Sequence, residues 1–474
     1  MSGLVSYGAY IPFTRVARSE IAAAWGGFKA PGEKAVANYD EDSLTMAVAA
    51  AMDCVNDIDI ETIDGLYFAT TTAPYKEKQS AATVATILGL PRTATTMDFS
   101  GSLRCGMNAV KAAMDAVSAG SARNILVCAA DVRLGHPQGA MELNIGDGAA
   151  ALLIGKDNVT VEIKGSISIH NECQDWWRSD QDKFLRSAED RFAVQEGYTA
   201  VVAETIKKGM TLFGTTPKDY AKAAITAPNM RVLARTAGKL GFDPKTQILD
   251  NVMMGVGDTG SALALMSLVA ALETTSAGDR ILLAGHGNGC DVIDLEVTDN
   301  ISGMSNKRGI RKHLESKMMT TYNKYLRWRE LVDVQPPARP PVQLRQPSPS
   351  AQWRENQWEL RLTGTRCTAC GTAQYPPQRI CMKCKEKDQM ERYSYLDKQG
   401  KITSFSHDHV METLDPPVTI TVTDFEGGGR IMCDMTDRVP EDVEVGMNVE
   451  MTFRKLYYVG GIYNYWWKAR PIRC

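Results

Sequence analysis

The sequence predicts an α/β region over residues 1–302, followed by a short cysteine-rich ribbon and a small all-β barrel. Three observations predict this fold class. Short apolar runs and alanine-rich stretches fill the first region, as expected for buried strands and packed helices. Two Cys-x-x-Cys pairs follow within residues 367–384, and residues 395–474 alternate like short strands between glycine-containing turns.

Composition excludes several classes of protein. The chain has 474 residues and a net charge of -3, so a general affinity for nucleic acid is not expected. No apolar run is long enough to cross a membrane, and the first residues do not read as a secretory signal. The eleven cysteines include two close pairs, which favours a metal site in a reducing compartment over a disulfide framework. We therefore expect a cytoplasmic protein.

Elements of the α/β region can be placed from its apolar runs. Residues 66–69, 125–128 and 151–154 are short and continuously apolar, which predicts buried strands. Residues 81–88 are rich in alanine and predict a helix.

The rest of the chain is organised around residues 98–120, where Cys105 follows a turn rich in glycine and serine. Apolar residues recur after it at helical spacing, at Met107, Val110, Met114 and Val117, and Gly120 marks the helix end. Because a helix N-terminus favours negative charge, Cys105 is placed to act as a nucleophilic thiolate. A buried structural cysteine is the alternative, and position alone does not separate the two.

The α/β region contains an internal repeat. Residues 118–120 and 276–278 both read Ser-Ala-Gly, 158 residues apart, and each follows an alanine-rich helix and precedes an apolar strand. This order predicts a duplicated unit with halves at about 1–160 and 161–302. Chance similarity of the two turns is the alternative.

Four segments together carry a resemblance to a known family: Ser102–Gly106, Asn144–Ala150, Asp258–Ser261 and Gly285–Gly289. In this order and spacing they resemble the thiolase superfamily of condensing enzymes, in particular its branch of 3-oxoacyl-carrier-protein synthase III and hydroxymethylglutaryl-CoA synthase. The resemblance implies a duplicated, five-layered thiolase-like α/β/α/β/α fold over residues 1–302. It also implies a homodimer.

The resemblance implies an acyltransferase in which Cys105 forms a thioester with an acyl group. A carbon–carbon bond is then made or broken with a second coenzyme A thioester, so acyl-CoA is a substrate and not a held cofactor. Two positions depart from the family pattern. Thr71 stands where hydroxymethylglutaryl-CoA synthases have a glutamate, and Thr226 stands where the family has a histidine before a proline. These departures disfavour a plain hydroxymethylglutaryl-CoA synthase.

Other site residues are implied by the same resemblance. The turn at 285–289 borders the family's active site and lends a backbone N–H to its oxyanion hole, which makes His286 a catalytic candidate. A histidine in a dimer interface or a loop cap is the alternative. Asp258 is either a catalytic residue or a helix N-cap. Substrate-binding roles are implied for Asn229, Gly287 and Asn288, and the loop residue His136 has a weaker claim.

Residues 303–360 differ in character from the region before them. Basic residues gather between Lys307 and Arg329, and a proline-rich stretch follows at 336–341. We therefore expect a basic helical and proline-rich linker over 303–360. A solvated connecting helix is the simpler interpretation of the basic part, and binding to a phosphate or an acidic partner is the alternative.

The strongest local motif consists of four cysteines: Cys367, Cys370, Cys381 and Cys384. Two Cys-x-x-Cys pairs at this spacing supply four thiolates that close tetrahedrally on one Zn²⁺. Four protein ligands leave no open position, so the site is expected to be structural. It predicts a zinc ribbon over residues 361–390, and four cysteines without metal are the alternative.

Residues 391–474 predict a small barrel. Strand-like runs occur at 400–406, 418–423, 449–453 and 463–469, and five or so short strands suit a Greek-key barrel. Ribbon and barrel together resemble the DUF35-type module, which implies a rubredoxin-like ribbon and an OB-fold. The aromatic residues at 457–467 lack a matching basic stripe, so core packing or a protein interface is favoured over nucleic-acid binding.

Two hypotheses for the whole chain belong to different classes. The leading one is an acyl-CoA condensing enzyme with Cys105 as its nucleophile. The alternative is a catalytically degenerate scaffold or partner subunit of an active thiolase, with the ribbon and barrel used for docking or acyl-CoA transfer. Thr71 and Thr226 favour the alternative, and Cys105 opposes it. Neither hypothesis involves a membrane or a nucleic acid.

Overall fold

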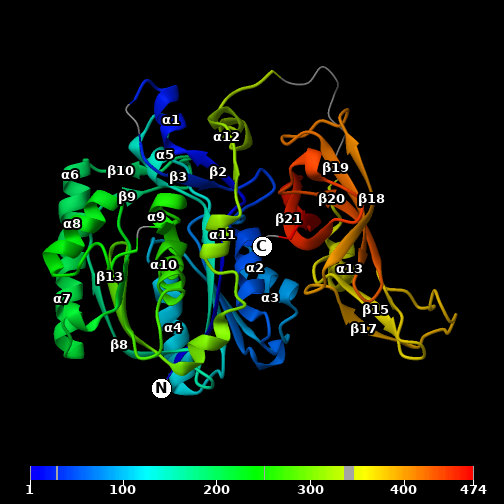
Figure 1. The fold of residues 1–474 in the computed structure, drawn as a ribbon, viewed down its shortest axis with the longest axis horizontal. Helices are drawn as coiled ribbons and strands as arrows, with labels where there is room; N and C mark the ends of the chain where they lie inside the picture. The colour runs from blue at the N-terminus through cyan, green and yellow to red at the C-terminus, as the bar shows by residue number, and fades with distance from the viewer. Residues whose placement is uncertain (1, 28–29, 250, 336–345, 473–474) are drawn as a thin grey trace. The chain divides into compact units, whose positions relative to one another are not determined.

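A computed structural model describes residues 2–27, 30–249, 251–335 and 346–472 (Figure 1). The chain divides into two compact units. The α/β unit comprises Met1–Asn38, Asp42–Ala85 and Leu90–Tyr325, and the ribbon–barrel unit comprises Tyr39–Glu41, Thr86–Gly89 and Leu326–Cys474. No helix within the described residues is both long and apolar enough to cross a bilayer.

A nine-stranded sheet organises the α/β unit. Its order is β5 (Thr95–Phe99), β4 (Gly65–Ala69), β6 (Ile125–Asp131), β7 (Gly148–Gly155), β1 (Gly3–Tyr10), β8 (Val161–His170), β13 (Gly289–Val297), β12 (Arg280–His286) and β11 (Lys222–Ile225). The strands predicted at 66–69, 125–128 and 151–154 are β4, β6 and β7.

The two halves of this sheet repeat one pattern. In the first half β4 runs parallel to β6, and β6, β7 and β1 are successively antiparallel. In the second half β11 runs parallel to β12, and β12, β13 and β8 are successively antiparallel. The halves meet where Gly3 and Leu4 of β1 pair with β8. The duplication that the Ser-Ala-Gly repeat predicts is therefore present in the topology.

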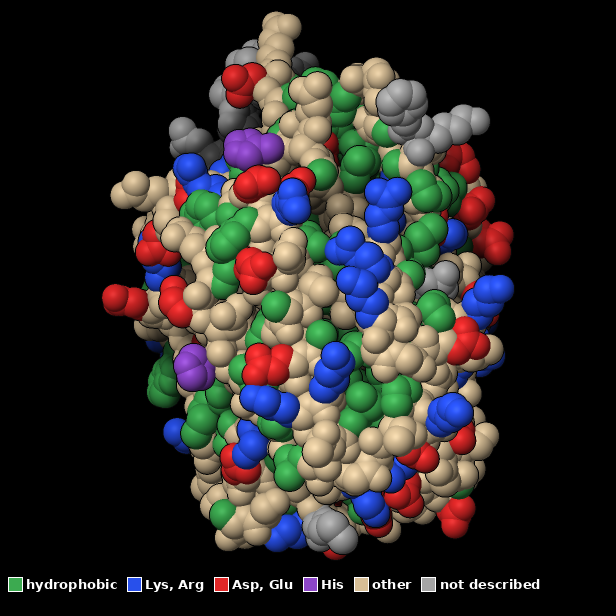
Figure 2. All heavy atoms as spheres, turned by 90° about the vertical axis from the view of Figure 1, so that its left-hand side faces the viewer, with side chains coloured by type: hydrophobic (Ala, Val, Ile, Leu, Met, Phe, Trp, Pro, Cys, Tyr) green, Lys and Arg blue, Asp and Glu red, His purple; other side chains and the backbone are tan. Residues whose placement is uncertain are grey.

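Helices complete five layers (Figure 1). α4 (Cys105–Ala119) and α10 (Leu263–Leu272) lie between the halves, α2 (Ser43–Val55) and α3 (Ser80–Leu88) cover the first half, and α7 (Val201–Phe213) and α8 (Met230–Leu240) cover the second. On the face that includes α7 and α8, lysines and arginines lie among acidic and apolar side chains (Figure 2).

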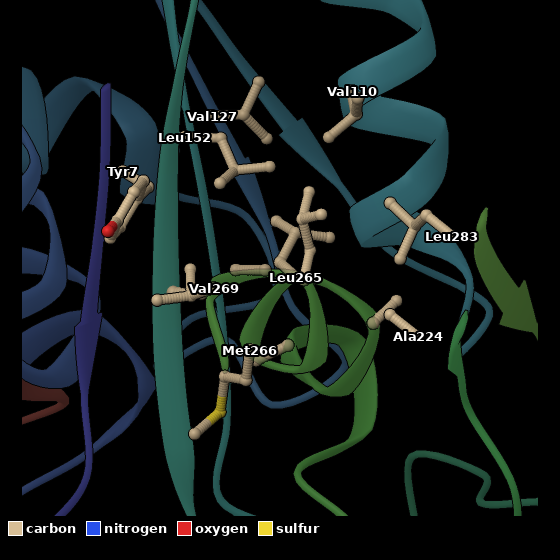
Figure 3. Packing of buried hydrophobic residues seen from close by; sticks show 14 of the residues in the cluster. Tyr7, Val110, Val127, Leu152, Ala224, Leu265, Met266, Val269 and Leu283 are labelled. Carbon is tan, nitrogen blue, oxygen red and sulfur yellow. The ribbon is translucent and has the colours of Figure 1, made fainter. Parts of the chain in front are cut away.

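The central core lies around α4 and α10. Figure 3 shows Val110 of α4 and Leu265 of α10 between Val127 of the first half and Leu283 of the second. All four side chains are at most 3% exposed. The helix predicted after Cys105 forms as expected, and it ends at Gly120, which adopts a left-handed conformation with φ 79°.

Shorter elements border this core. They are α1 (Arg18–Ala24), η1 (Ile60–Thr62), α5 (Ala140–Asn144), α6 (Asp190–Phe192), the π-helix η2 (Ala193–Ala200), η3 (Pro217–Asp219), α9 (Asn251–Gly255), η4 (Gly260–Ala262) and η5 (Asp299–Met304). A two-stranded sheet pairs β9 (Trp176–Trp177) with β10 (Arg186–Ser187).

Residues 303–325, expected within a linker, are folded into the α/β unit. They form α11 (Arg311–Glu315), β14 (Met318–Met319) and the start of α12 (Tyr322–Trp328). β14 joins β2 (Thr14–Ala17) and β3 (Glu33–Val36) in a three-stranded sheet. Lys307 is 7% exposed because its ammonium donates to the backbone oxygens of Asp53, Cys54 and Asn56. The proline-rich stretch at 336–341 lies outside the described residues.

The main part of the ribbon–barrel unit starts at Leu326, within α12, and includes α13 (Pro349–Glu359), which precedes the ribbon. The ribbon sheet contains β15 (Thr363–Cys367), β16 (Ala373–Gln374) and β17 (Met390–Ser394). A closed barrel follows, in the order β18 (Gly400–Asp408), β19 (Val418–Phe425), β20 (Arg430–Met435), β22 (Ile462–Pro471) and β21 (Asn448–Val459), with η6 (Pro440–Asp442) between β20 and β21. Trp467 is fully buried in it, which supports core packing for part of the aromatic cluster.

Candidate active site

Cys105 is the first residue of α4. It is 1% exposed. A Cβ atom at the next residue, Gly106, would lie 2.3 Å from the backbone oxygen of Ser261, so only glycine fits there. The sequence therefore places Cys105 at the crossing of α4 with the residues that lead into α10.

A helix N-terminus lowers the pKa of a cysteine, but the surroundings of Cys105 raise it. Burial raises the pKa of the Cys105 thiol, and the nearby Asp131 carboxylate raises it further. Hydrogen bonds from Ser261 and from backbone N–H groups lower the pKa but do not outweigh burial. The helix N-terminus alone favours a thiolate, whereas burial of the side chain in the fold favours the thiol. The resting side chain is a thiol.

Asp131 is itself fully buried at the end of β6 and is well satisfied. Its Oδ1 accepts hydrogen bonds from the hydroxyls of Thr70, Thr71 and Thr72 and from the Thr71 backbone N–H, over 2.7–3.0 Å. Its Oδ2 accepts from the Ser261 backbone N–H at 2.8 Å. Thr71, which stands where the resemblance implies a glutamate, thus holds a buried carboxylate and supplies none of its own.

A cavity of about 180 Å³, partly open to solvent, lies beside the start of α4. Leu103 and Met107, which flank Cys105, line it. Most of its other walls are apolar, and its polar lining residues are Arg133, Asn144, Asp190, Thr226, Asn229, Asp258 and His286. Three predicted site residues, Asn229, Asp258 and His286, therefore border one cavity.

His286 ends β12 and is almost completely buried. Its backbone N–H donates to the hydroxyl of Thr226 at 3.0 Å, and its Nε2 lies 2.8 Å from the backbone oxygen of Gly197. The Asp175 carboxylate lies 3.5 Å from the same nitrogen. Burial lowers the pKa of His286, and the charge of Asp175 opposes that shift. The imidazole is thus neutral at rest and is close to one carboxylate.

The turn after His286 packs against the residues that precede Cys105. The Ser102 hydroxyl donates to the Gly287 backbone oxygen at 2.9 Å, and the Arg104 guanidinium donates to the Asn288 oxygen at 3.2 Å. The Gly287 N–H is used inside the turn, where it donates to the Gly289 oxygen. In this conformation the N–H groups of His286 and Gly287 are both engaged, which differs from the oxyanion-hole role that the resemblance implies.

The remaining candidates have clear structural partners. Asp258 pairs with Arg133 at 2.7 Å and accepts from the Gly260 N–H at 2.9 Å, so it caps this turn while it lines the cavity. Asn229 caps α8 through the Val232 N–H.

His136 and Asn288 contribute less to the cavity. His136 is exposed and packs on Phe184, with ring centroids 4.1 Å apart. Neither His136 nor Asn288 is among the residues that line the cavity.

The ribbon contains a second site. The sulfur atoms of Cys367, Cys370, Cys381 and Cys384 all lie within 4.8 Å of one another. Four sulfurs at this separation fit a tetrahedral Zn²⁺ with no open position. The structure therefore brings together all four cysteines of the predicted metal site.

Sequence reasoning did not find Asp175, Asp131, Arg133 or Gly197. Each acts through a contact with a residue far away in the chain, and none lies in a motif. The one available signal was indirect, because Asp131 follows the apolar run at 125–128, where a strand end faces the active-site region of many α/β folds.

Comparison with known proteins agrees with both parts of the chain. Residues 359–391 match a family described as "ChsH2, rubredoxin-like zinc ribbon domain", and residues 393–454 match "ChsH2, C-terminal OB-fold domain". The α/β part is similar to the hydroxymethylglutaryl-CoA synthase of Picrophilus torridus, with 31% identity over 345 residues, 70% of this chain and 98% of the relative. The Methanocaldococcus jannaschii synthase is likewise 31% identical, over 70% of this chain and 99% of the relative.

Solved structures share the fold at lower identity. One is "MvaS in complex with 3-hydroxy-3-methylglutaryl coenzyme A", with a TM-score of 0.63, 20% identity and coverage of 72% of this chain and 94% of that one. Another is the 3-oxoacyl-[acyl-carrier-protein] synthase III of Aquifex aeolicus, with a TM-score of 0.54, 18% identity and coverage of 62% and 100%. The thiolase-like fold expected from the sequence is confirmed.

Proposed function

The chain belongs to the hydroxymethylglutaryl-CoA synthase family, and on that premise we propose that it is an acyl-CoA condensing enzyme with Cys105 as its acyl acceptor. The observation that carries the proposal is the position of Cys105. It lies at the start of α4, between two residues that line a cavity bordered by His286 and Asp258. An apolar cavity with a few convergent polar groups suits the acyl and pantetheine parts of a coenzyme A thioester.

The first step is acyl transfer. The Cys105 sulfur attacks the thioester carbonyl, the bond to the coenzyme A sulfur breaks, and the proton of Cys105 passes to the departing thiol. His286 is the proposed proton carrier, because its ring lines the cavity and is neutral at rest. Asp258 and Asn229, which line the same cavity, are assigned to orienting the substrate around it, whereas Gly287 and Asn288, which do not line it, are given no such role.

The second step makes or breaks a carbon–carbon bond with another coenzyme A thioester. The family premise supports condensation, and thiolytic cleavage uses the same groups in reverse. Two threonines disfavour a reaction identical to that of hydroxymethylglutaryl-CoA synthase, because they stand where the resemblance implies a glutamate and a histidine. Thr71 is hydrogen-bonded to Asp131, and Thr226 is hydrogen-bonded to the backbone N–H of His286. We place the chain in the family but assign its acid–base chemistry to a different set of residues.

Two further features belong to this proposal. The four ribbon cysteines would hold one structural Zn²⁺, which would fix the ribbon fold and take no part in the reaction. The active form is proposed to be a homodimer, as the resemblance to the thiolase superfamily implies. A cytoplasmic location is proposed because the paired cysteines suit a reducing compartment.

Intact-protein mass spectrometry tests the nucleophile. The full chain is incubated with acetyl-, propionyl- and butyryl-CoA, denatured and weighed, and the adduct is then mapped to a peptide. We expect one added acyl group on the wild type, none on Cys105→Ala, and an unchanged adduct on Cys128→Ala, whose thiol is also buried but lies in β6. An adduct that persists in Cys105→Ala contradicts the assignment.

A scaffold or partner subunit of an active thiolase remains the second candidate. Two observations favour it: the resting Cys105 is a buried thiol, and Ile380 and Met382 of the ribbon are 53% and 67% exposed. Apolar side chains exposed together suit a protein interface. Absence of any adduct on zinc-loaded wild-type protein, together with co-purification of a thiolase, would favour this candidate over the enzyme.

A further inference from the structure

The loop before β9 and the π-helix η2 both contact the His286 ring at Nε2. The ring meets Tyr198 edge to face, with centroids 5.1 Å apart, and meets Trp176 at 5.9 Å. The Gly197 carbonyl and the Asp175 carboxylate both approach Nε2. π-helical turns are rare and are frequent at functional sites. The ring is therefore fixed in its plane as well as in its position.

The contact with Gly197 decides which ring nitrogen carries the proton. A backbone carbonyl oxygen can only accept a hydrogen bond, so Nε2 must be the donor over the 2.8 Å separation. In the neutral ring Nδ1 is then unprotonated. Within the described part of the chain Nδ1 has no hydrogen-bond partner. Nδ1 is the nitrogen left to accept a proton from a molecule in the cavity.

Asp175 is built into this arrangement. Its side chain is 5% exposed, its Oδ1 accepts from the Trp176 N–H at 2.7 Å, and its Oδ2 faces the ring. Gly197 packs so closely on it that a Cβ atom there would lie 2.7 Å from the Asp175 Cβ. A buried carboxylate costs folding free energy unless it is well compensated. Its position beside Nε2 gives it a partner whenever the ring becomes charged.

Resting on the proposed condensing function, we propose that Asp175 is the positioning residue of an acid–base pair in which Nδ1 of His286 takes the α-proton of the second coenzyme A thioester. The C–H bond breaks, its electron pair forms the enolate, and the proton bonds to Nδ1. The enolate carbon then attacks the thioester carbonyl on Cys105, and the Cys105 thiolate leaves. The imidazolium returns the proton to that sulfur, so the cycle ends with a neutral ring and a thiol.

The charges around the ring set the direction of its pH dependence. Burial lowers the pKa of His286, Asp175 and Asp258 raise it, and Arg104 lowers it. Tyr198 faces the ring as a neutral phenol whose hydroxyl donates to a backbone oxygen. Removal of the Asp175 charge therefore lowers the pKa of the ring and makes Nδ1 a weaker base.

Exchange of α-protons in deuterated water reads out this step directly. The full, zinc-loaded chain is mixed with acetyl-, propionyl- or butyryl-CoA, and loss of the α-proton signal is followed by NMR across a range of pH. We expect wild-type exchange to rise with pH and then level off. Asp175→Asn should exchange about 10–100-fold more slowly on the plateau, with the rising limb about one pH unit lower. Asp175→Glu should recover part of the rate.

Asp180→Asn is the matched control, because Asp180 lies in the loop that follows β9 but pairs with the exposed Lys76. It should behave as wild type. A slower exchange in Asp175→Asn, without a shift in the pH at which the rate rises, assigns Asp175 a merely structural role and overturns the proposal. An exchange rate that is unchanged at every pH also overturns it. Acylation of Cys105 is measured in parallel. Acylation without any exchange overturns this proposal alone, whereas no acylation overturns the proposed function as well.

The tautomer of His286 can be measured on the wild-type protein, so this test does not require the Asp175 variants to fold. Long-range ¹H–¹⁵N spectra distinguish the two neutral tautomers of histidine. We expect the resonances that disappear in His286→Ala to show a protonated Nε2 and an unprotonated Nδ1. The opposite tautomer would overturn the proposal.

Discussion

At the scale of single residues, burial determines how Cys105 behaves before substrate binds. Its thiol pKa is raised by burial and by Asp131, so little thiolate exists at neutral pH. We predict that alkylation of Cys105 by iodoacetamide keeps accelerating up to about pH 9.5, beyond the point where an ordinary cysteine of pKa about 8.5 begins to level off. Peptide-level mass spectrometry at several pH values measures this rate. A plateau below about pH 8 would instead show a stabilised thiolate.

A second prediction at this scale concerns Glu273, which follows α10. Burial raises its pKa to about 7, although its carboxylate accepts the backbone N–H groups of Ile310 and Arg311. Because the folded state holds this proton more tightly than the unfolded chain does, stability falls as pH rises from about 4.5 to about 7 and is flat above that. At 1.36 kcal/mol per pH unit, the loss over these roughly 2.5 pH units is on the order of 3 kcal/mol.

Comparison with Glu273→Gln isolates this effect. Urea unfolding of the α/β unit, read by pulse proteolysis at peptides of α10, should show a smaller loss of stability in the variant over that pH range. Glu204→Gln is the control, because Glu204 is exposed and pairs with the exposed Lys208 within α7. Parallel pH profiles for wild type and Glu273→Gln would contradict the prediction.

The same scale shows what the sequence could reveal about the site. The four ribbon cysteines lie within a short stretch, so their spacing alone predicted a shared metal. Cys105 was found because a helix start has a local signature. Asp175 had none, since its carboxylate reaches His286 across 111 positions of the chain through a loop without regular pattern. The pKa of Cys105 also depends on Asp131, which only the fold brings near.

At the scale of elements, Gly106 in α4 and Gly120, which caps its C-terminus, allow the packing of this helix to be tested. A Cβ at Gly106 would meet the Ser261 backbone oxygen at 2.3 Å, whereas Gly120 has open space but a φ of 79°. We predict that Gly106→Ala destabilises the α/β unit by about 3 kcal/mol or more, because backbone must move. Gly120→Ala should cost only about 1 kcal/mol of conformational strain. Urea unfolding compares the two, and equal losses would contradict close packing at Gly106.

Strands and helices could be predicted from the sequence where the spacing of apolar residues matches the side chains that the fold buries. The strands β4, β6 and β7 are continuously apolar and were predicted, and the repeated Ser-Ala-Gly turn correctly indicated the duplication. Residues 303–325 were misjudged because their basic composition suggested a solvated segment. Lys307 instead places its charge on three backbone oxygens at the end of α2, a compensation that no local pattern reveals.

At the scale of the whole molecule, the two units have different sources of stability. The α/β unit has an extensive apolar core around α4 and α10. The ribbon is small, and the only cluster of metal-type ligands found within the described residues lies in it. Short domains of this size depend on metal for their fold, because they bury too little apolar surface. Metal removal should therefore act on one unit and spare the other.

This difference gives a prediction for the full chain. We expect one zinc per chain by elemental analysis, loss of zinc in Cys381→Ser, and retention in Cys433→Ser, whose buried thiol lies in β20 outside the cluster. In calorimetry, chelation should lower or abolish one unfolding transition and leave the transition of the α/β unit within about 2 °C, because its core contains none of the ligands. Acylation of Cys105 should survive at temperatures below that remaining transition. A single transition that shifts as a whole on chelation would mean that the two units unfold cooperatively, and the zinc would then stabilise the catalytic unit as well.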